Sequence, residues 1–224
     1  MKPEDLKPPF TWDERRVHYE DKILYVPEYY DKLDAFKFPG WEALFESIKP
    51  IKIEYCSGNG AWVADRAELF PDANWIAIEK DFKRVRKIWS KIQNRSISNL
   101  IAVCGEGRKV SHHFFPHTSV DEVFVNFPDP WPKKRHVKHR IIQPPFIAEL
   151  YRILKESGKI NLVTDDPDYS SWMIAVMQGH TGFKSLHGAP YYLNELPEYG
   201  TSWFDTLWRE KGRTIRYHQF AKVI

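Results

Sequence analysis

From Trp41 onward, short apolar segments alternate with amphipathic segments, and this alternation restricts the possible folds more than any other feature of the chain. The apolar segments have the length of buried strands, and the segments between them repeat apolar residues at helical spacing. This order indicates an α/β domain with a mostly parallel sheet and helices on both faces. We expect strands at 51–55, 74–79, 100–104, 120–127 and 159–164, helices at 61–70, 81–95, 145–154 and 168–178, and a weaker helical segment after residue 104.

The two ends of the chain depart from this pattern. Two further strand-like segments, 183–186 and 215–223, bring the expected sheet to seven strands, of which the C-terminal one is expected to be antiparallel. Residues 1–40 are rich in proline, tyrosine and acids and show no clear periodicity. We expect an N-terminal extension over 1–40, laid on the domain as an arm, and a single domain over 41–224. A chain of 224 residues suffices for one sizeable core.

No apolar run approaches the length of a bilayer span, and the charged, proline-broken start does not resemble a signal peptide. Cys56 and Cys104 lack the Cys-x-x-Cys spacing of metal sites. His112, His113 and His117 fall in a stretch that looks like a loop and has no Cys or Asp partners. We expect a cytoplasmic protein with reduced thiols and no metal site, present as a monomer or a weak homodimer.

The net charge is only +3, but basic side chains are concentrated in two segments. Residues 80–95 hold seven Lys and Arg against one acid, and residues 131–140 hold five with no acid. Clustered cations on a nearly neutral protein indicate a local polyanion site. A solvated helix face is the alternative, and for residues 80–95 it is an equally good explanation.

The first strand runs into Ser57-Gly58-Asn59-Gly60, a glycine turn of the kind that lets a backbone approach a nucleotide closely. The next strand ends at Glu79, where a carboxylate can accept hydrogen bonds from both ribose hydroxyls of an adenosine. Val63 stands where a dinucleotide fingerprint has its third glycine, which argues against NAD and favours S-adenosylmethionine, a cofactor without pyrophosphate. Glu106, after the third strand, could reach the adenine amino group. An ordinary glycine turn with solvated acids is the alternative.

The most specific segment, Asn126-Phe127-Pro128-Asp129-Pro130-Trp131, directly follows the fourth strand. Two prolines restrict its backbone and hold Asp129 and Trp131 in fixed directions at the carboxyl edge of the sheet, where such sheets bind ligands. The second basic segment comes next. An acid and an aromatic ring beside cations suit a purine on an RNA backbone, whereas a purely structural turn would not need five cations.

This segment resembles the signature loop of the bacterial tRNA (guanine-N7-)-methyltransferases. The shared residues are Phe127-Pro128-Asp129-Pro130-Trp131, then Lys133, then Arg135-His136-x-Lys138-x-Arg140. Thr164-Asp165-Asp166-x-x-Tyr169 resembles the next motif of that family, and the resemblance covers roughly residues 45–220. It implies a Rossmann-like, class I S-adenosylmethionine-dependent methyltransferase that acts on tRNA, with its target nucleotide in the variable loop.

The resemblance also implies roles for individual positions. Cofactor contacts would come from Glu54, Glu79, Glu106 and Asp129, and Asp129 would also be the catalytic position. Substrate contacts would come from Lys133 and Asp165, RNA contacts from residues 135–140, and the family's late Thr-x-x-Glu element falls on Ser202 to Asp205. The chain departs from the family at Cys56, where glycine is usual, at Glu106 for Asp, and at Ser202 and Asp205 for Thr and Glu.

The chemistry expected of these residues follows from the nucleophile. Guanine N7 has an in-plane lone pair and no proton, so the enzyme needs alignment more than a general base. A carboxylate at Asp129 would stabilise the growing positive charge on the purine and accept hydrogen bonds from guanine N1–H or N2–H, with Asp165 as a second acceptor. Phosphates would be bound by Lys133, Arg135, Lys138 and Arg140, with His136 and His139 adding RNA contacts, and the base would leave its stack.

Two other functions remain open from the sequence. One is a nucleic-acid methyltransferase that acts on an exocyclic amine, since the segment at 126–131 faintly resembles the Asn/Asp-Pro-Pro-aromatic loop of those enzymes. The second residue of that tetrad would have to be proline, where this chain has Phe127, and Asp129 interrupts the tetrad. The other is a catalytically inactive RNA-binding module of the same fold, against which the carboxylates at Glu54, Glu79 and Asp129 argue.

Overall fold

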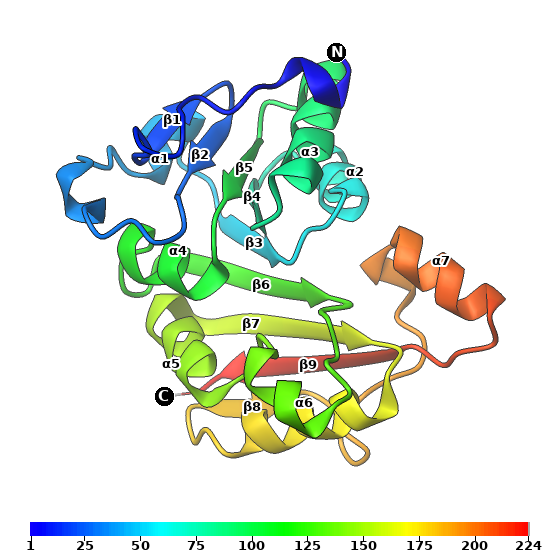
Figure 1. Ribbon diagram of the computed structural model, residues 1–224. Coiled ribbons are helices and arrows are strands. Elements are labelled where there is room, and N and C mark those ends of the chain that lie inside the picture. The colour runs from blue at the N-terminus through cyan, green and yellow to red at the C-terminus, as the bar shows by residue number, and fades with distance from the viewer. Residues whose placement is uncertain (224) are drawn as a thin grey trace. The chain divides into compact units, whose positions relative to one another are not determined.

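The computed structural model describes residues 1–223, and the chain divides into two compact units, Met1–Phe115 and Pro116–Ile224. Figure 1 shows that each unit consists of strands with helices packed beside them. The units are described one at a time. Within residues 1–223, no helix has both the length and the apolar character that crossing a membrane requires.

The first unit is built on three parallel strands in the order β5-β4-β3, namely β3 (Ile51–Tyr55), β4 (Asn74–Glu79) and β5 (Leu100–Cys104). Every residue of β4 is buried, as expected for a strand covered on both faces. The connecting helices are α2 (Ala61–Leu69) and α3 (Phe82–Asn94), with α4 (Gly107–Phe114) after β5 and the short α1 (Trp41–Phe45) before β3. Because the strands are parallel, β3, β4 and β5 all end at one edge, where the glycine turn, Glu79 and Glu106 follow them.

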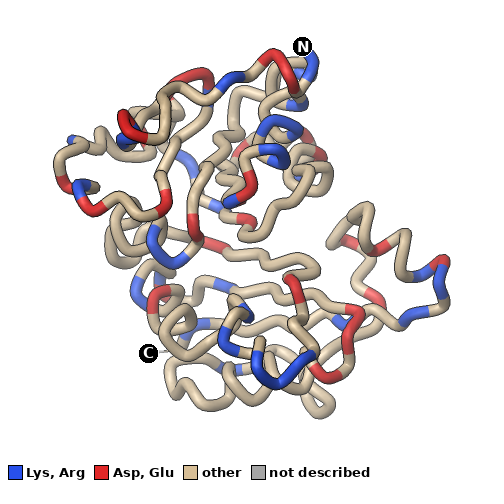
Figure 2. The backbone as a smooth tube through the Cα atoms, in the orientation of Figure 1, with Lys and Arg blue, Asp and Glu red and all other residues tan. Residues whose placement is uncertain are grey.

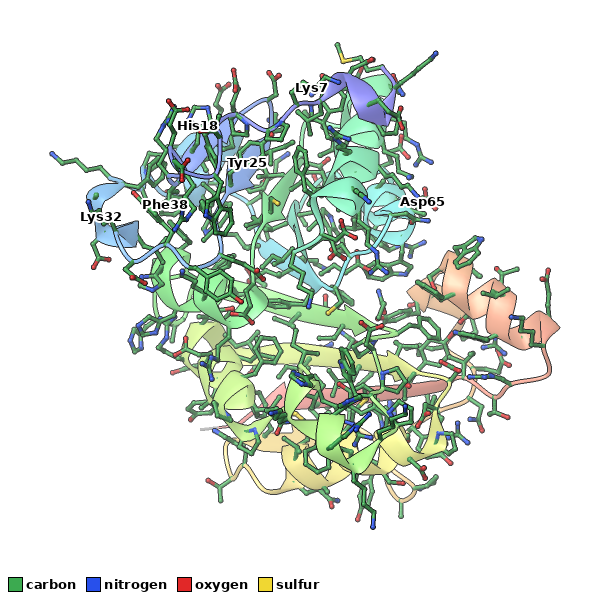
Figure 3. The ribbon with its side chains drawn as sticks, in the orientation of Figure 1. Lys7, His18, Tyr25, Lys32, Phe38 and Asp65 are labelled. Carbon is green, nitrogen blue, oxygen red and sulfur yellow. The ribbon has the colours of Figure 1, made fainter. Side chains whose placement is uncertain are left out.

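The N-terminal segment adds two strands that the sequence did not predict. The hairpin of β1 (His18–Glu20) and β2 (Ile23–Tyr25) is antiparallel, and β2 pairs in parallel with β5, so that the sheet extends beyond β5. Tyr25, labelled in Figure 3, packs its ring near Phe10, His18 and Phe82. Strands of three residues are too short to show a period of two, and for this reason residues 18–25 gave no pattern.

The second unit has the strand order β6-β7-β9-β8, with β6 (Val120–Asn126), β7 (Leu154–Thr164), β8 (Phe183–Ser185) and β9 (Arg216–Lys222). β6 and β7 are parallel, and β9 is antiparallel to both β7 and β8. All seven strands expected from the sequence are therefore present, the C-terminal one is antiparallel as predicted, and the mixed α/β class is confirmed. The helices of this unit are α5 (Pro144–Ile153), α6 (Pro167–Gln178) and α7 (Trp203–Glu210).

Several local features differ from the expectations. The helix expected over 145–154 ends at Ile153, and β7 begins at once with an irregular stretch in which Ser157 has φ 61° and Gly158 leaves no room for a side chain. His112 and His113 lie on α4, not in a loop. The cationic segment after Trp131 contains the 3-10 helix η3 (Lys134–His139), and α7 was not predicted at all.

Candidate functional site

The glycine turn after β3 contains three left-handed residues within five. Cys56 has φ 58°, Gly58 has φ 56° and Gly60 has φ 69°. Glycine adopts this region without steric cost, whereas a residue with a Cβ is strained there by about 1 kcal/mol. Cys56 therefore carries the strain that the glycine usual in the resembled family would avoid.

Gly58 and Gly60 are required for different reasons. A Cβ on Gly58 would meet no atom closer than 3.9 Å, so only its backbone conformation favours glycine. A Cβ on Gly60 would lie 2.7 Å from the Ile88 side chain on α3, so this glycine also permits the close packing of the turn against that helix. The Lys91 ammonium on the same helix donates to the Asn59 carbonyl at 2.9 Å, which ties α3 to the turn.

Glu79 at the end of β4 is buried and already holds the turn in shape. Its Oε2 accepts from the Gly58 N–H at 2.9 Å, and its Oε1 accepts from the Asp81 N–H at 3.0 Å. The Arg84 guanidinium lies 3.6 Å from Oε2. A carboxylate has about four acceptor sites, so Glu79 keeps capacity for two hydroxyl donors while it braces the backbone.

The other two predicted cofactor acids have different surroundings. Glu106 is exposed and caps the N-terminus of α4, where its carboxylate accepts from the N–H groups of Arg108 at 3.0 Å and Lys109 at 2.8 Å. Glu54 is buried within β3, and its carbonyl accepts from the Ser57 hydroxyl at 2.8 Å. Glu54, Glu79 and Glu106 thus stand at or near the carboxyl ends of three neighbouring parallel strands.

In the second unit, the proline loop Phe127–Trp131 follows β6. Phe127 has φ 47° and Trp131 has φ 43°, so the chain bends sharply on both sides of Asp129. The Phe127 N–H donates to the Val163 carbonyl on β7 at 2.9 Å, which anchors the start of the loop. Asp129 is exposed, and within residues 1–223 its carboxylate forms no hydrogen bond or ion pair, so it is available to a ligand.

The basic segment behind this loop presents its cations to solvent, and Figure 2 shows them as a blue run after β6. Four of them are exposed and have no hydrogen-bond or ion-pair partner in the described part of the chain: Lys133, Lys134, Arg135 and Lys138. The rings of His136 and His139 lie against Trp131, with centroids 5.7 and 5.2 Å away. Cations around an aromatic cluster match what the sequence predicted for this segment.

Arg140, the fifth cation of the basic segment, is buried, unlike the other four. Only 8% of it is exposed, its Nε–H donates to the Pro130 carbonyl at 2.8 Å, and its guanidinium lies over the rings of Tyr169 and Trp172. The sequence grouped Arg140 with the RNA contacts because it continues a run of cations. Its burial separates it from Lys133, Arg135 and Lys138, and this difference was not visible in the sequence.

The segment after β7 carries Asp165 and Asp166. Asp166 caps α6, and its carboxylate accepts from the Tyr169 N–H at 2.7 Å. The Asp165 carboxylate forms an ion pair with Arg213, and the Arg216 guanidinium donates to the Asp165 carbonyl at 3.3 Å. Sequence reasoning named Asp165 but missed Arg213, since nothing in a pattern pairs residues 48 positions apart.

Ser202 and Asp205 have structural partners. The Ser202 hydroxyl accepts from the Asp205 N–H at 3.1 Å and caps α7, an arrangement that the Ser-x-x-acid spacing could have indicated. The buried Asp205 carboxylate pairs with Arg209 at 2.7 Å and accepts from the Tyr217 hydroxyl, whose pKa is raised to about 12 by burial and by this hydrogen bond. A pocket of about 290 Å³ opens beside these groups, and Glu195, Thr201 and Thr206 also line it.

Solved structures share the fold of this chain. The 16S rRNA methyltransferase KamB aligns with a TM-score of 0.60 at 14% identity, over 82% of this chain and 93% of that one. A SAM-dependent methyltransferase from Aquifex aeolicus aligns with a TM-score of 0.55 at 14% identity, over 83% and 90%. At such identity the likeness establishes the fold alone, which is the Rossmann-like fold of class I methyltransferases.

Proteins of similar sequence show which family the chain belongs to. Residues 48–217 match a family model described as "Putative methyltransferase". The whole chain is 48% identical to a tRNA (guanine-N(7)-)-methyltransferase of Chlamydia felis over 224 residues, 99% of that protein. The chain therefore belongs to the tRNA (guanine-N7-)-methyltransferase family, as the proline loop predicted.

Proposed function

We propose that this protein transfers the methyl group of S-adenosylmethionine to N7 of a guanine in tRNA. Its family membership supports the reaction class. The observation that carries the proposal is the proline loop, where an exposed carboxylate at Asp129 has no partner within residues 1–223 and adjoins four exposed cations without partners. Such a loop offers an acceptor for a base and counter-charges for a phosphate backbone.

The first unit fits an adenosine-containing cofactor without pyrophosphate. Gly58 and Gly60 give a backbone that a ligand can approach, and Glu79 has acceptor sites left for ribose hydroxyls. Val63, the position of the missing third glycine, is fully buried in α2. Glu54 and Glu106, at the ends of the flanking strands, would complete the contacts. S-adenosylmethionine supplies an electrophilic methyl group on a sulfonium when it is bound.

The acceptor base needs alignment and charge stabilisation. Guanine N7 attacks with its own lone pair, so no residue has to remove a proton before the methyl transfer. The purine becomes cationic as the new bond forms, and the Asp129 carboxylate would stabilise that charge. Asp129 would also contact the cofactor, which places one carboxylate on both reaction partners.

The same carboxylate would select guanine. Asp129 would accept from guanine N1–H or N2–H, donors that adenine does not present in that arrangement, and Asp165 would supply a second acceptor. Phosphates of the RNA would be bound by Lys133, Arg135 and Lys138, which gives affinity more than sequence choice. Ser202 and Asp205 would contribute to the substrate contacts through α7, and the target nucleotide would lie in the variable loop of the tRNA.

The test is methylation of unmodified tRNA with labelled S-adenosylmethionine, followed by nucleoside analysis. We expect 7-methylguanosine as the product. Asp129→Ala should lower turnover at least about 100-fold, the scale of losing one preorganised electrostatic group, and should leave tRNA binding largely intact. Asp121→Ala is the matched control and should retain turnover, because Asp121 lies near the start of β6 and pairs with Lys155 of β7.

The same assay separates the alternatives. A methyl group on an exocyclic amine would favour the other class of nucleic-acid methyltransferase. No product together with no heat of S-adenosylmethionine binding in calorimetry would identify an inactive RNA-binding module. Normal turnover by Asp129→Ala would show that the catalytic position is elsewhere.

A further inference from the structure

The prolines restrict the backbone of the proline loop but also remove hydrogen-bond donors from it. Pro128 and Pro130 have no N–H group, and neither does Pro132 directly after the loop. The two bends, at Phe127 and Trp131, both lie in the left-handed region that residues with a Cβ avoid. A loop with few donors and two strained residues needs contacts from outside to keep one conformation.

Arg140 supplies such a contact at the centre of the loop. Its Nε–H donates to the carbonyl of Pro130, the residue between Asp129 and Trp131, at 2.8 Å. The side chain is 8% exposed, whereas the neighbouring cations Lys133, Arg135 and Lys138 are fully at the surface. The Arg140 guanidinium is therefore covered by protein and is poorly accessible to a phosphate of the RNA.

The other side of Arg140 faces α6. Its guanidinium lies 4.9 Å from the centroid of the buried Tyr169 ring and 5.2 Å from that of Trp172, distances at which cation–π attraction is effective. Both rings are anchored in turn, because Asp166 caps the helix at the Tyr169 N–H and the Trp172 Nε1–H donates to the Ile142 carbonyl at 2.7 Å. Arg140 thus spans from the loop after β6 to the helix after β7.

We propose that Arg140 is a positioning residue, not an RNA contact, and that it fixes the Asp129 loop relative to the Asp165 segment. The inference rests on the function proposed above, in which both acids accept from the guanine. The loop and the segment before α6 belong to the second unit, and Arg140 contacts both. Its planar guanidinium can donate to the carbonyl and stack on two rings at once, which a lysine ammonium cannot do.

The experiment compares steady-state kinetics of Arg140→Lys and Arg140→Gln with those of Lys138→Ala. Both Arg140 variants should lower kcat at least tenfold, change KM for tRNA less than threefold and keep the wild-type salt dependence of tRNA binding. Arg140→Lys should recover part of the loss relative to Arg140→Gln because it keeps the charge. Lys138→Ala should instead raise KM and reduce the salt dependence. Wild-type kcat in Arg140→Lys, or a raised KM with a reduced salt dependence, would overturn the proposal.

A second measurement keeps this inference separable from the proposed function. Amide hydrogen exchange, followed by mass spectrometry, reports the order of the loop whether or not the chain methylates tRNA. Peptides that contain residues 129–139 should exchange at least tenfold faster in both Arg140 variants, while peptides of β4 remain at the wild-type rate. Unchanged exchange of the loop would refute the positioning role, whereas absence of 7-methylguanosine from the wild-type reaction would refute only the proposed function.

Discussion

The glycine turn after β3 and the proline loop after β6 are two answers to one requirement, a sharp bend at the carboxyl end of a parallel strand. The glycine turn uses residues that enter the left-handed region easily, and only Cys56 is strained there. The proline loop uses residues that resist bending, and both of its left-handed residues, Phe127 and Trp131, have large side chains. The first bend is favoured by its own sequence, whereas the second depends on its surroundings.

The contacts that hold the two bends differ accordingly. Glu79 accepts from backbone N–H groups of the glycine turn, which glycines and ordinary residues supply. The proline loop has no N–H group at Pro128 and Pro130, and Arg140 braces it by donating to the Pro130 carbonyl. The acidic Glu79 therefore holds the glycine turn at its N–H groups, and the basic Arg140 holds the proline loop at a carbonyl group. A turn with available N–H groups can be held by an acid, whereas a turn in which prolines remove N–H groups can be held by a base at its carbonyl groups.

The largest effect is expected at Gly60. Gly60→Ala would place a Cβ 2.7 Å from Ile88 on a residue with φ 69°, and we expect a loss of about 2–4 kcal/mol in the free energy of unfolding. Urea unfolding measures it. The control is Gly188→Ala, where no atom lies within 4 Å of the new Cβ and the stability should change by less than about 0.5 kcal/mol. Equal effects would mean that the turn does not depend on its glycines.

Acid should lower the stability of the protein through a buried histidine of β9. The fully buried His218 accepts from the Ser170 hydroxyl of α6 and donates to the Tyr191 carbonyl, and burial lowers its pKa to about 4. The unfolded chain takes up this proton below about pH 6.5 and the folded chain does not. Stability should therefore fall by up to about 1.4 kcal/mol per pH unit between pH 6.5 and 4.

Urea unfolding at several pH values tests this dependence. His218→Gln should reduce the slope with pH in that range. The exposed His117 provides the matched control, and His117→Gln should keep the wild-type slope. A slope that His218→Gln leaves unchanged would assign the acid sensitivity to other groups.

The basic segments behind the two bends give the next comparison. In the first segment, Arg84 lies near Glu79, and Arg95, just after α3, pairs with Asp65 and Glu68. Lys87 is exposed and its side chain has no partner within residues 1–223, and the same holds for four cations of the other segment. Lys138→Ala should weaken tRNA binding about tenfold and reduce the slope of log K against log salt by about 1. Lys87→Ala, an exposed lysine of α3, should change affinity less than twofold. Equal losses would show that both segments bind RNA.

The smallest effect is expected at Cys56. Cys56→Gly should raise the free energy of unfolding by up to about 0.5 kcal/mol, because the relief of about 1 kcal/mol of left-handed strain exceeds the entropy that glycine loses on folding. Cys104→Gly is the opposite case, since Cys104 lies in β5 without a positive φ and the change should destabilise. Denaturant titration of both variants measures the difference, and destabilisation by Cys56→Gly would contradict the strain.

The elements found by sequence reasoning are those with long patterns. α3 repeats its apolar residues over 13 positions, and β4 is apolar from Trp75 to Ile78, so both were predicted nearly to the residue. The missed elements, α1, β1, β2 and α7, are short. β2 finds its partner in β5, roughly 80 residues later, and a local pattern carries no information on such pairing.

The candidate site shows the same contrast between local patterns and long-range contacts. Residue types and spacings were enough to nominate Glu79, Asp129 and the cations after it, because turn chemistry and charge are local properties of a chain. Only the folded structure decided that Glu79 also braces the glycine turn, that Arg213 pairs with Asp165, and that Arg140 lies under two rings instead of at the surface. Burial and long-range pairing depend on which strands and helices become neighbours, and the whole chain must fold before any one residue acquires them.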